Sequence, residues 1–414
     1  MPLKKFDLDV VLDEIDGIGM KHWLLRQLAL AYKEARKNKI KTFNEHQYEA
    51  NWTDNLQNLC KVIYENAYLP SSSLAFIIFD PMIREIFAAQ FVDRIVHHLL
   101  YTICGKWWDA RMIYDSFSCR DGKGTLLGIQ RLQKMMRQAS DNGHKKAIAY
   151  KMDIRGYFMS LPRKELYKVV KWGLDRQFEP YMHRAAARKL KQLCEFLWKM
   201  VLMDDPARKA RKREPLSNWN KLPLVKSLFY RLPGVGIVIG NLTSQLVSNI
   251  YLSTFDRYIK FTLKYKYYVR YVDDFVIVVP EEDYKRLLKD IEKIERFLRN
   301  VLHLTLHPDK RYVQDVRKGV NFLGARVYLF CVYPSNRLQK KFRREIKKFL
   351  ESGGKERESL TSYMGLMKHM NGDGFVKKVF DEYGLDFKLY LESKSEERRG
   401  FDVIFDELAV GAKL

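Results

Sequence analysis

The chain has 414 residues, of which 47% are hydrophobic, and these hydrophobic residues are spread along its whole length. That length and composition are typical of a folded protein with a sizeable core, and they exclude a disordered chain. The formal net charge of +24 favours a polyanionic partner, either nucleic acid or an anionic membrane. No apolar run is long enough to span a bilayer, and the N-terminus lacks the pattern of a signal peptide. We therefore expect a cytoplasmic protein that binds nucleic acid and no membrane.

The predicted elements alternate between helical stretches and short strands. Hydrophobic spacing first predicts helices over 8–70, followed within 75–104 by a hairpin and then a helix from about Gln90. A strand over 146–154 and helices over 163–200 come next. The run of Arg and Lys over 207–213 predicts a solvated basic loop. Hydrophobic spacing then predicts a helix over 240–264, a hairpin over 267–279, a helix over 282–302, a strand pair over 320–333 and helices over 336–371. The acidic stretch 381–408 indicates no function. This order predicts an α+β chain with a small antiparallel sheet.

The five cysteines show no pairing pattern. None of them lies in a Cys-x-x-Cys pair, which argues against a zinc ribbon or a disulfide framework. We expect buried, reduced thiols at Cys60, Cys104, Cys119, Cys194 and Cys331.

Aspartates interrupt apolar strand patterns at two places that are remote in the sequence. Asp153 ends the strand predicted over 146–154, and Asp273-Asp274 lie within the predicted hairpin. A partly buried carboxylate costs several kcal/mol unless something pairs with it, and two adjacent carboxylates also repel each other. A divalent cation removes both penalties, and two Mg²⁺ ions can clamp an in-line phosphoryl displacement. This pattern predicts a two-metal site on Asp153, Asp273 and Asp274.

Each aspartate motif has a structural alternative when it is considered alone. Asp273-Asp274 could be an ordinary hairpin turn, because Asp favours turns, and Asp153 could be the N-cap of a following helix. The turn interpretation does not require Asp153, so the occurrence of both motifs favours the metal site.

The order of these motifs resembles that of bacterial and phage reverse transcriptases, from about residue 75 to residue 370. Tyr271-Val272-Asp273-Asp274 resembles the Tyr-x-Asp-Asp box of the palm, and the stretch from Lys151 to Phe158 resembles the first palm motif. The resemblance implies a right-hand polymerase fold with fingers, a palm built on a small antiparallel sheet flanked by helices, and a helical thumb. It places the N-terminal helices and fingers at 1–145, the palm at 146–335 with a nucleotide-proximal motif at 217–245, and the thumb and acidic tail at 336–414.

One motif narrows the resemblance to a subgroup of reverse transcriptases. This motif is Ile239-Gly240-Asn241-Leu242-Thr243-Ser244-Gln245. Group II intron enzymes begin this motif with Gln and end it with Ser-Pro, whereas the version here is similar to that of diversity-generating retroelements. The fingers segment from Tyr114 to Thr125 is similar to the same subgroup. Two further segments resemble the last palm motifs: His307-Pro308-Asp309-Lys310 and Asn321-Phe322-Leu323-Gly324.

The resemblance implies a function and a set of site residues. The function is RNA-directed DNA synthesis, with low fidelity in this subgroup. The implied metal ligands are Asp153, Ile154, Asp273 and Asp274, holding two Mg²⁺ ions with Mn²⁺ as an alternative. Phe158 is the implied steric gate, and the implied dNTP contacts are Arg84, Arg120, Phe158, Ile239, Gln245 and Lys310. The implied template and primer contacts are Gly240, Asn241, Ser244 and Tyr271.

The expected partners are template RNA, nascent cDNA and dNTPs, and the subgroup resemblance adds a basic oligomeric accessory protein. Basic faces near 163–193 and 207–226 are predicted to hold the RNA–DNA duplex by its backbone, with solvated faces as the alternative. Other functions stay open: a group II intron-like or bacterial defence-type reverse transcriptase, an RNA-dependent RNA polymerase, or a catalytically silent palm-fold RNA-binding protein.

Overall fold

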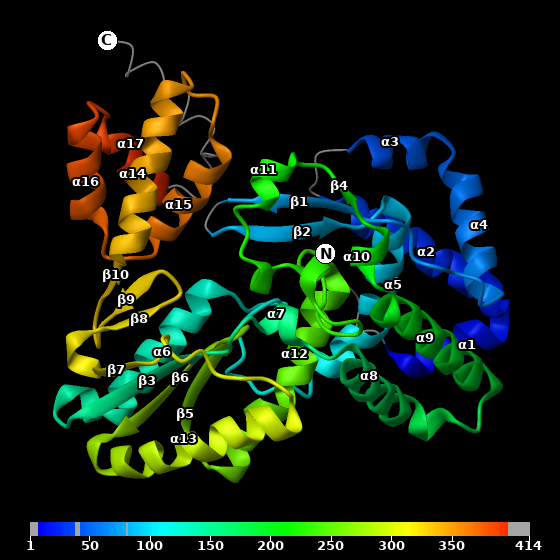
Figure 1. The fold of residues 1–414 in the computed structure, drawn as a ribbon, viewed down its shortest axis with the longest axis horizontal. Helices are drawn as coiled ribbons and strands as arrows, with labels where there is room; N and C mark the ends of the chain where they lie inside the picture. Colours follow the sequence, from blue (N-terminus) through cyan, green and yellow to red (C-terminus); the bar gives the residue numbers. More distant parts are fainter. Residues whose placement is uncertain (1–6, 38–41, 80–81, 396–414) are drawn as a thin grey trace. The chain divides into compact units, whose positions relative to one another are not determined.

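The computed structural model describes residues 7–37, 42–79 and 82–395 (Figure 1). By internal contacts the chain divides into two compact units. The first unit holds residues 1–121, 153–264 and 290–308, and the second unit holds 122–152, 265–289 and 309–414. Each unit is thus built from three separate stretches of sequence. These boundaries differ from the predicted fingers, palm and thumb, which stay a prediction.

The first unit is mainly helical. Its longer helices are α1 (Leu8–Ile18), α2 (Met20–Arg36), α3 (Phe43–Ala50), α4 (Trp52–Tyr64), α5 (Phe91–Asp109), α8 (Arg163–Phe178), α9 (Ala185–Met203) and α12 (Leu242–Arg257). Its short helices are α7 (Tyr157–Ser160), α10 (Pro206–Lys209) and α11 (Leu216–Trp219). Helix α5 packs against both α2 and α12, and α8 packs against α9. The helices predicted over 163–200 are therefore α8 and α9, which pack against each other.

The first unit also contains a three-stranded sheet in the order β2-β1-β4, formed by β1 (Leu74–Ile78), β2 (Arg84–Ala88) and β4 (Arg211–Lys212). β1 and β2 form the predicted antiparallel hairpin, with Phe76 opposite Ile86. β4 pairs with β1 in parallel, with Leu74 opposite Arg211. The prediction of a solvated loop over 207–213 is therefore wrong, because this segment begins as α10 and then adds a strand to the edge of the hairpin.

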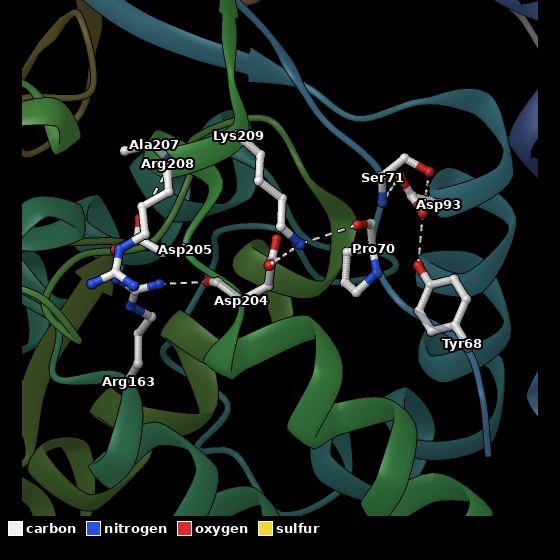
Figure 2. Close-up of polar contacts among 10 residues, drawn as sticks. All are labelled: Tyr68, Pro70, Ser71, Asp93, Arg163, Asp204, Asp205, Ala207, Arg208 and Lys209. Carbon is white, nitrogen blue, oxygen red and sulfur yellow. Dashed lines mark hydrogen bonds and ion pairs between the residues drawn. The ribbon is translucent and has the colours of Figure 1, made fainter.

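Polar contacts hold the segment that leads into β4 (Figure 2). Lys209 pairs with Asp204 at 2.8 Å, and its ammonium also donates to the Pro70 carbonyl, 3.5 Å away. The buried Arg163 guanidinium donates to the Asp204 carbonyl and, at 3.0 Å, to the carboxylate of Asp205. These contacts explain how a strongly basic segment, with no hydrophobic pattern of its own, takes a fixed place beside β1.

The second unit contains a four-stranded sheet in the order β5-β6-β3-β7. Its strands are β3 (Ala147–Asp153), β5 (Tyr267–Tyr271), β6 (Asp274–Pro280) and β7 (Tyr312–Asp315). β3 and β6 are the central strands and carry nearly continuous runs of buried residues, which indicates that both faces of the sheet are covered along these strands. Helix α6 (Thr125–Ala139) contacts β5 and β6. The predicted strand at 146–154 and the predicted hairpin at 267–279 are confirmed.

The remaining elements of the second unit are a small sheet and the C-terminal helices. β8 (Val320–Phe322), β9 (Ala325–Val327) and β10 (Val332–Pro334) form an antiparallel three-stranded sheet where two strands were predicted. The helices that follow are α14 (Asn336–Glu351), α15 (Glu358–Lys368), α16 (Asp373–Glu382) and α17 (Phe387–Ser395). Helix α13 (Glu281–Val301) begins in the second unit and ends in the first. The last part of the acidic tail lies outside the described residues.

Two predictions about chemistry can be compared directly with the fold. All five cysteines are free, and Cys60, Cys104 and Cys194 are buried as expected, but Cys119 is exposed and Cys331 is only half-buried. Cys119 stands on a turn with a φ of 51°, so the expectation of a buried thiol is wrong there. Across residues 7–37, 42–79 and 82–395, no helix is long and apolar enough to cross a membrane.

Candidate active site

The β5–β6 hairpin presents the aspartate pair on a strained two-residue turn. Tyr271 lies opposite Asp274, so Val272 and Asp273 form the turn. Val272 has a φ of 56°, a conformation that costs a β-branched residue on the order of 1–3 kcal/mol. The fully buried Arg270 donates to the Val272 carbonyl over 2.9 Å and so stabilises the turn. A strained turn held by a buried arginine is typical of a functional site rather than a simple connection.

The neighbouring strand β3 brings a third aspartate to the same end of the sheet. At one end, the Glu281 amide donates to the Lys146 carbonyl over 3.1 Å, and at the other end Lys151 pairs with Asp274 at 2.7 Å. β3 therefore runs antiparallel to β6, and it ends at Asp153 where β6 begins at Asp274. The turn and N-cap alternatives for the separate motifs do not account for this shared end.

The backbone around Asp153 is fixed by one of the predicted motifs. Its carbonyl accepts a hydrogen bond from the His307 amide over 2.8 Å, and Ile154 forms an isolated bridge with Leu306. His307 thus has a structural role in the first unit. Lys310 is exposed and precedes β7 in the second unit, and its role near the leaving group stays a prediction.

Carboxylates at strand ends suit Mg²⁺, which is usually held by one or two carboxylates, with water and substrate phosphates completing its shell. Within the part of the chain that the structure describes, no group of three or more His, Cys, Asp or Glu side chains is gathered closely enough to form a metal site by itself. Asp153 and Asp273 each offer the kind of donor that Mg²⁺ prefers, and substrate phosphates would supply further oxygens. The assignment of Asp153, Ile154, Asp273 and Asp274 as ligands stays a prediction.

The predicted steric gate lies on α7, immediately after Asp153. Phe158 is half-buried, and the ring of Tyr157 packs edge-on to it with centroids 5.4 Å apart. The Tyr157 hydroxyl donates to the Ser248 carbonyl on α12 over 2.6 Å, and the Phe158 carbonyl accepts from the Ile237 amide over 2.9 Å. Gly236 permits this approach, because a Cβ there would lie 2.4 Å from Leu228. Phe158 and the 239–245 motif are therefore parts of one packed substructure.

The 239–245 motif lines a cavity of about 450 Å³ in the first unit. Gly240, Asn241, Leu242 and Gln245 contribute from the motif. The other lining residues come from β2, from α5 and from the link between them, and they are Ile86, Phe87, Ala88, Ala89, Arg94, His97 and His98. A cavity of this volume and mixed polarity can hold a nucleobase with its sugar. Arg84 is exposed at the start of β2, and it lies on the same face of that strand as Ile86 and Ala88.

Other members of the motif face protein. Ile239 packs against the apolar core that joins β1 and β2 to residues 219–238. Ser244 is buried in the first turn of α12, and Asn241 rather than Ser244 occupies the N-cap position. The contacts of Ser244 with template or primer stay a prediction, which the burial of this side chain does not favour.

His97 fixes the start of α12. Its Nδ1 lies 3.0 Å from the Thr243 hydroxyl, and both side chains are buried. Burial, reinforced by the nearby positive charge of His98 and Arg94, lowers the pKa of His97 to about 3. The imidazole is therefore neutral at physiological pH. Sequence analysis missed this residue, and its only signal was a histidine within an apolar helical pattern.

Residues 83–327 match the sequence profile of the family described as reverse transcriptase (RNA-dependent DNA polymerase), and this match covers more than half of the chain. The chain belongs to the reverse transcriptase family. Its mixed helical and antiparallel-sheet architecture is the right-hand polymerase fold of that family, as predicted. Members of the family generally use divalent metal ions such as Mg²⁺.

Solved structures add little to the family assignment. Apo telomerase from Candida tropicalis is 10% identical with a TM-score of 0.45, and the match covers 83% of this chain and 63% of that one. Telomerase from Candida albicans, in complex with a TWJ fragment of telomeric RNA, is 12% identical with a TM-score of 0.42, covering 86% of this chain and 64% of that one. This chain therefore spans less than two thirds of either telomerase chain. No curated protein matches it.

In this reverse transcriptase, the two arginines predicted to meet the triphosphate differ sharply. Arg120 is nearly buried, and its guanidinium bonds to the Asp109 carboxylate at 2.5 Å and to the carbonyls of Asp109, Ile113 and Ser116. Its donors are thus used inside the first unit, whereas Arg84 is exposed on the strand that lines the cavity. Both assignments stay predictions, and the geometry favours Arg84.

The predicted nucleic-acid surfaces of the reverse transcriptase also differ. On α8 and α9 several of the cations are ion-paired: Lys168 with Glu165, Arg176 with Glu179, and both Lys171 and Lys191 with Glu195. By contrast, Arg211, Lys212 and Arg213 are exposed, and no described carboxylate forms an ion pair with them. The second unit adds a basic helix that sequence analysis did not single out. This is α14, whose cations are Arg337, Lys340, Lys341, Arg343, Arg344, Lys347 and Lys348.

Proposed function

We propose that this chain is an RNA-directed DNA polymerase that copies an RNA template into cDNA by two-metal phosphoryl transfer. The main support is the family match over residues 83–327, together with one sheet in which β3 ends at Asp153 beside the start of β6 at Asp274. Asp153 and Asp273 hold the metal ions, with the Ile154 carbonyl beside them. When bound, two Mg²⁺ ions would activate the primer 3′-hydroxyl and neutralise charge on the leaving pyrophosphate.

The protein's own groups position the substrates. Arg84 binds the triphosphate as a rigid fork of donors. Phe158 blocks a ribose 2′-hydroxyl; its ring packs on that of Tyr157, and its carbonyl accepts a hydrogen bond from the Ile237 amide. The 239–245 motif packs on the templating base and the incoming nucleotide, and the cavity lined by Gly240, Asn241 and Gln245 receives one nucleoside of that pair. Lys310 and Tyr271 complete the set at the leaving group and the primer.

The experiment is primer extension on an RNA template, with dNTPs or NTPs and Mg²⁺. We expect extension with dNTPs only, and a loss of about a thousandfold or more in rate for Asp273→Ala, because a metal ligand is removed. Glu282→Ala is the matched control, since Glu282 is an exposed acid on α13, and its rate should equal that of the wild type. Equal extension with NTPs, or an active Asp273→Ala variant, would reject the proposal.

We further propose that the enzyme belongs to a diversity-generating retroelement and copies with low fidelity, particularly opposite template adenine. The support is Ile239, an apolar side chain where related enzymes have a glutamine that can brace the incoming nucleotide. Losing a polar contact to the correct pair lowers discrimination, because specificity is a difference of affinities.

Ile239→Gln should reduce misincorporation opposite adenine by about tenfold, measured by sequencing the cDNA products. Ile239→Met is the matched control, because it keeps an apolar side chain against the core that Ile239 packs on. If both variants misincorporate as often as the wild type, residue 239 does not set fidelity.

A further inference from the structure

Lys151 joins three elements of the second unit through one ammonium group. It lies on β3, two residues before Asp153, and its side chain is 23% exposed. Its Nζ lies 2.7 Å from Oδ2 of Asp274 on β6 and 3.3 Å from the carbonyl oxygen of Asn321 on β8. It also lies 5.7 Å from the centre of the Phe322 ring. The two residues on β8 belong to the 320–327 hairpin, which is formed by β8 and β9.

This contact limits what Asp274 can do. An ammonium 2.7 Å from a carboxylate oxygen neutralises much of its charge, because the pair is mostly shielded from water and is weakly screened. A divalent ion on the same oxygen would be strongly repelled by the ammonium at that distance.

The carbonyl contact adds a mechanical role. Leu323 and Gly324, with φ angles of 51° and 83°, form the tight turn of the 320–327 hairpin. The Lys151 ammonium has three donors, so it can bind the Asn321 carbonyl and the Asp274 carboxylate at the same time. The hairpin is therefore coupled to the strand that begins at Asp274.

We propose that Lys151 is a positioning residue that holds Asp274 against the 320–327 hairpin and keeps this carboxylate off the metal ions. Asp153 and Asp273 then carry the metals, and Asp274 transmits the position of the hairpin to the strained turn. This proposal rests on the proposed two-metal function and refines it, because it divides the three predicted ligands into two roles.

The test uses the full chain with Lys151→Met, Lys151→Arg, Asp274→Asn and the double variant Lys151→Met/Asp274→Asn. Lys146→Met is the matched control. Lys146 lies just before the first residue of β3, at the end of the strand opposite Asp153. Like Lys151, it forms an ion pair, in its case with Glu281. Three quantities are measured: Mn²⁺ affinity by calorimetry on a chain-terminated primer–template, single-turnover extension rate, and melting temperature.

We expect Lys151→Met to bind Mn²⁺ several-fold more tightly, because the Asp274 charge is no longer neutralised, and to extend about tenfold more slowly, because the carboxylate and hairpin lose their link. Asp274→Asn leaves the ammonium without its carboxylate and should bind Mn²⁺ several-fold more weakly. The double variant is again neutral at this pair, so it should bind Mn²⁺ within about twofold of the wild type and extend no more slowly than either single variant. Lys151→Arg should retain most of the rate, and Lys146→Met should match the wild type.

Multiplicative losses in the double variant would overturn the proposal, and so would an unchanged Mn²⁺ affinity in Lys151→Met. If Lys151→Met folds poorly, Lys151→Gln replaces it, because it also removes the charge: the proposal requires tighter Mn²⁺ binding in Lys151→Gln and a value near that of the wild type in Lys151→Arg. A wild-type chain that extends no primer would refute the proposed function, while Mn²⁺ affinity and melting temperature would still test the link between Lys151 and Asp274.

Discussion

At the scale of single residues, His97 and Arg120 show how a polar side chain in or beside a predicted motif can serve the fold. The Arg120 fork is satisfied by Asp109 and by three carbonyls, and His97 is held by Thr243. The sequence marks such residues only as polar groups beside predicted motifs. Burial and partners decide their role, and these depend on which helices pack together.

His97 gives a pH prediction with a definite sign. Its folded-state pKa, about 3, lies below the unfolded value near 6.5. Folding favours the neutral imidazole. The contribution of His97 to the free energy of unfolding is therefore present above pH 6.5 and is lost as pH falls toward 3. Between pH 7 and pH 5 the wild type should lose about 2 kcal/mol more free energy of unfolding than His97→Gln, which cannot titrate.

Urea unfolding at the two pH values measures this difference. His183→Gln is the matched control, because His183 is exposed and its replacement should leave the pH dependence unchanged. Identical pH dependence in the wild type and His97→Gln would contradict the buried, neutral state of His97.

At the scale of elements, ion pairing separates two basic surfaces that look alike in the sequence. The cations of α8 and α9 face glutamates and an aspartate, whereas β4 and the residue after it expose cations that no described carboxylate pairs with. Lys212 instead lies over the rings of Trp219 and Phe229, at 4.7 and 4.3 Å. Arg211 and Arg213 can bind phosphate without first breaking an ion pair with a described carboxylate, so we predict the stronger backbone contact at β4 and the residue after it.

Replacing Arg211, Lys212 and Arg213 with glutamine should therefore weaken binding to an RNA–DNA duplex and reduce its salt dependence. The slope of log K against log salt concentration should fall by about 2 to 3, as for three lost phosphate contacts. The matched triple variant replaces Lys168, Lys171 and Arg176, which are ion-paired, and should change the slope by less than about 1. Equal slopes for the two triple variants would contradict the stronger backbone contact predicted for residues 211–213. Binding is measured by fluorescence anisotropy between 50 and 300 mM salt.

At the scale of the whole molecule, most elements and the order of motifs were predictable, because apolar periodicity and aspartate placement are local signals. The strand ending at Asp153 and the hairpin around Asp273 needed no tertiary information. The pairing of β4 with β1 did, since Arg211 and Lys212 carry no strand pattern. The same holds for the link from Lys151 to Asp274 and Asn321, three residues that are remote in sequence and joined only by the folded sheets.

The parallel pairing of β4 with β1 has a consequence during synthesis on the ribosome. Leu74 lies opposite Arg211, so roughly 140 further residues must be added before β1 gains its second neighbour, about ten to thirty seconds at ordinary elongation rates. Until then one edge of β1 presents open amides and carbonyls, a template for pairing with other chains. Nascent chains that stall before residue 211 are therefore the form of this protein most in need of a chaperone.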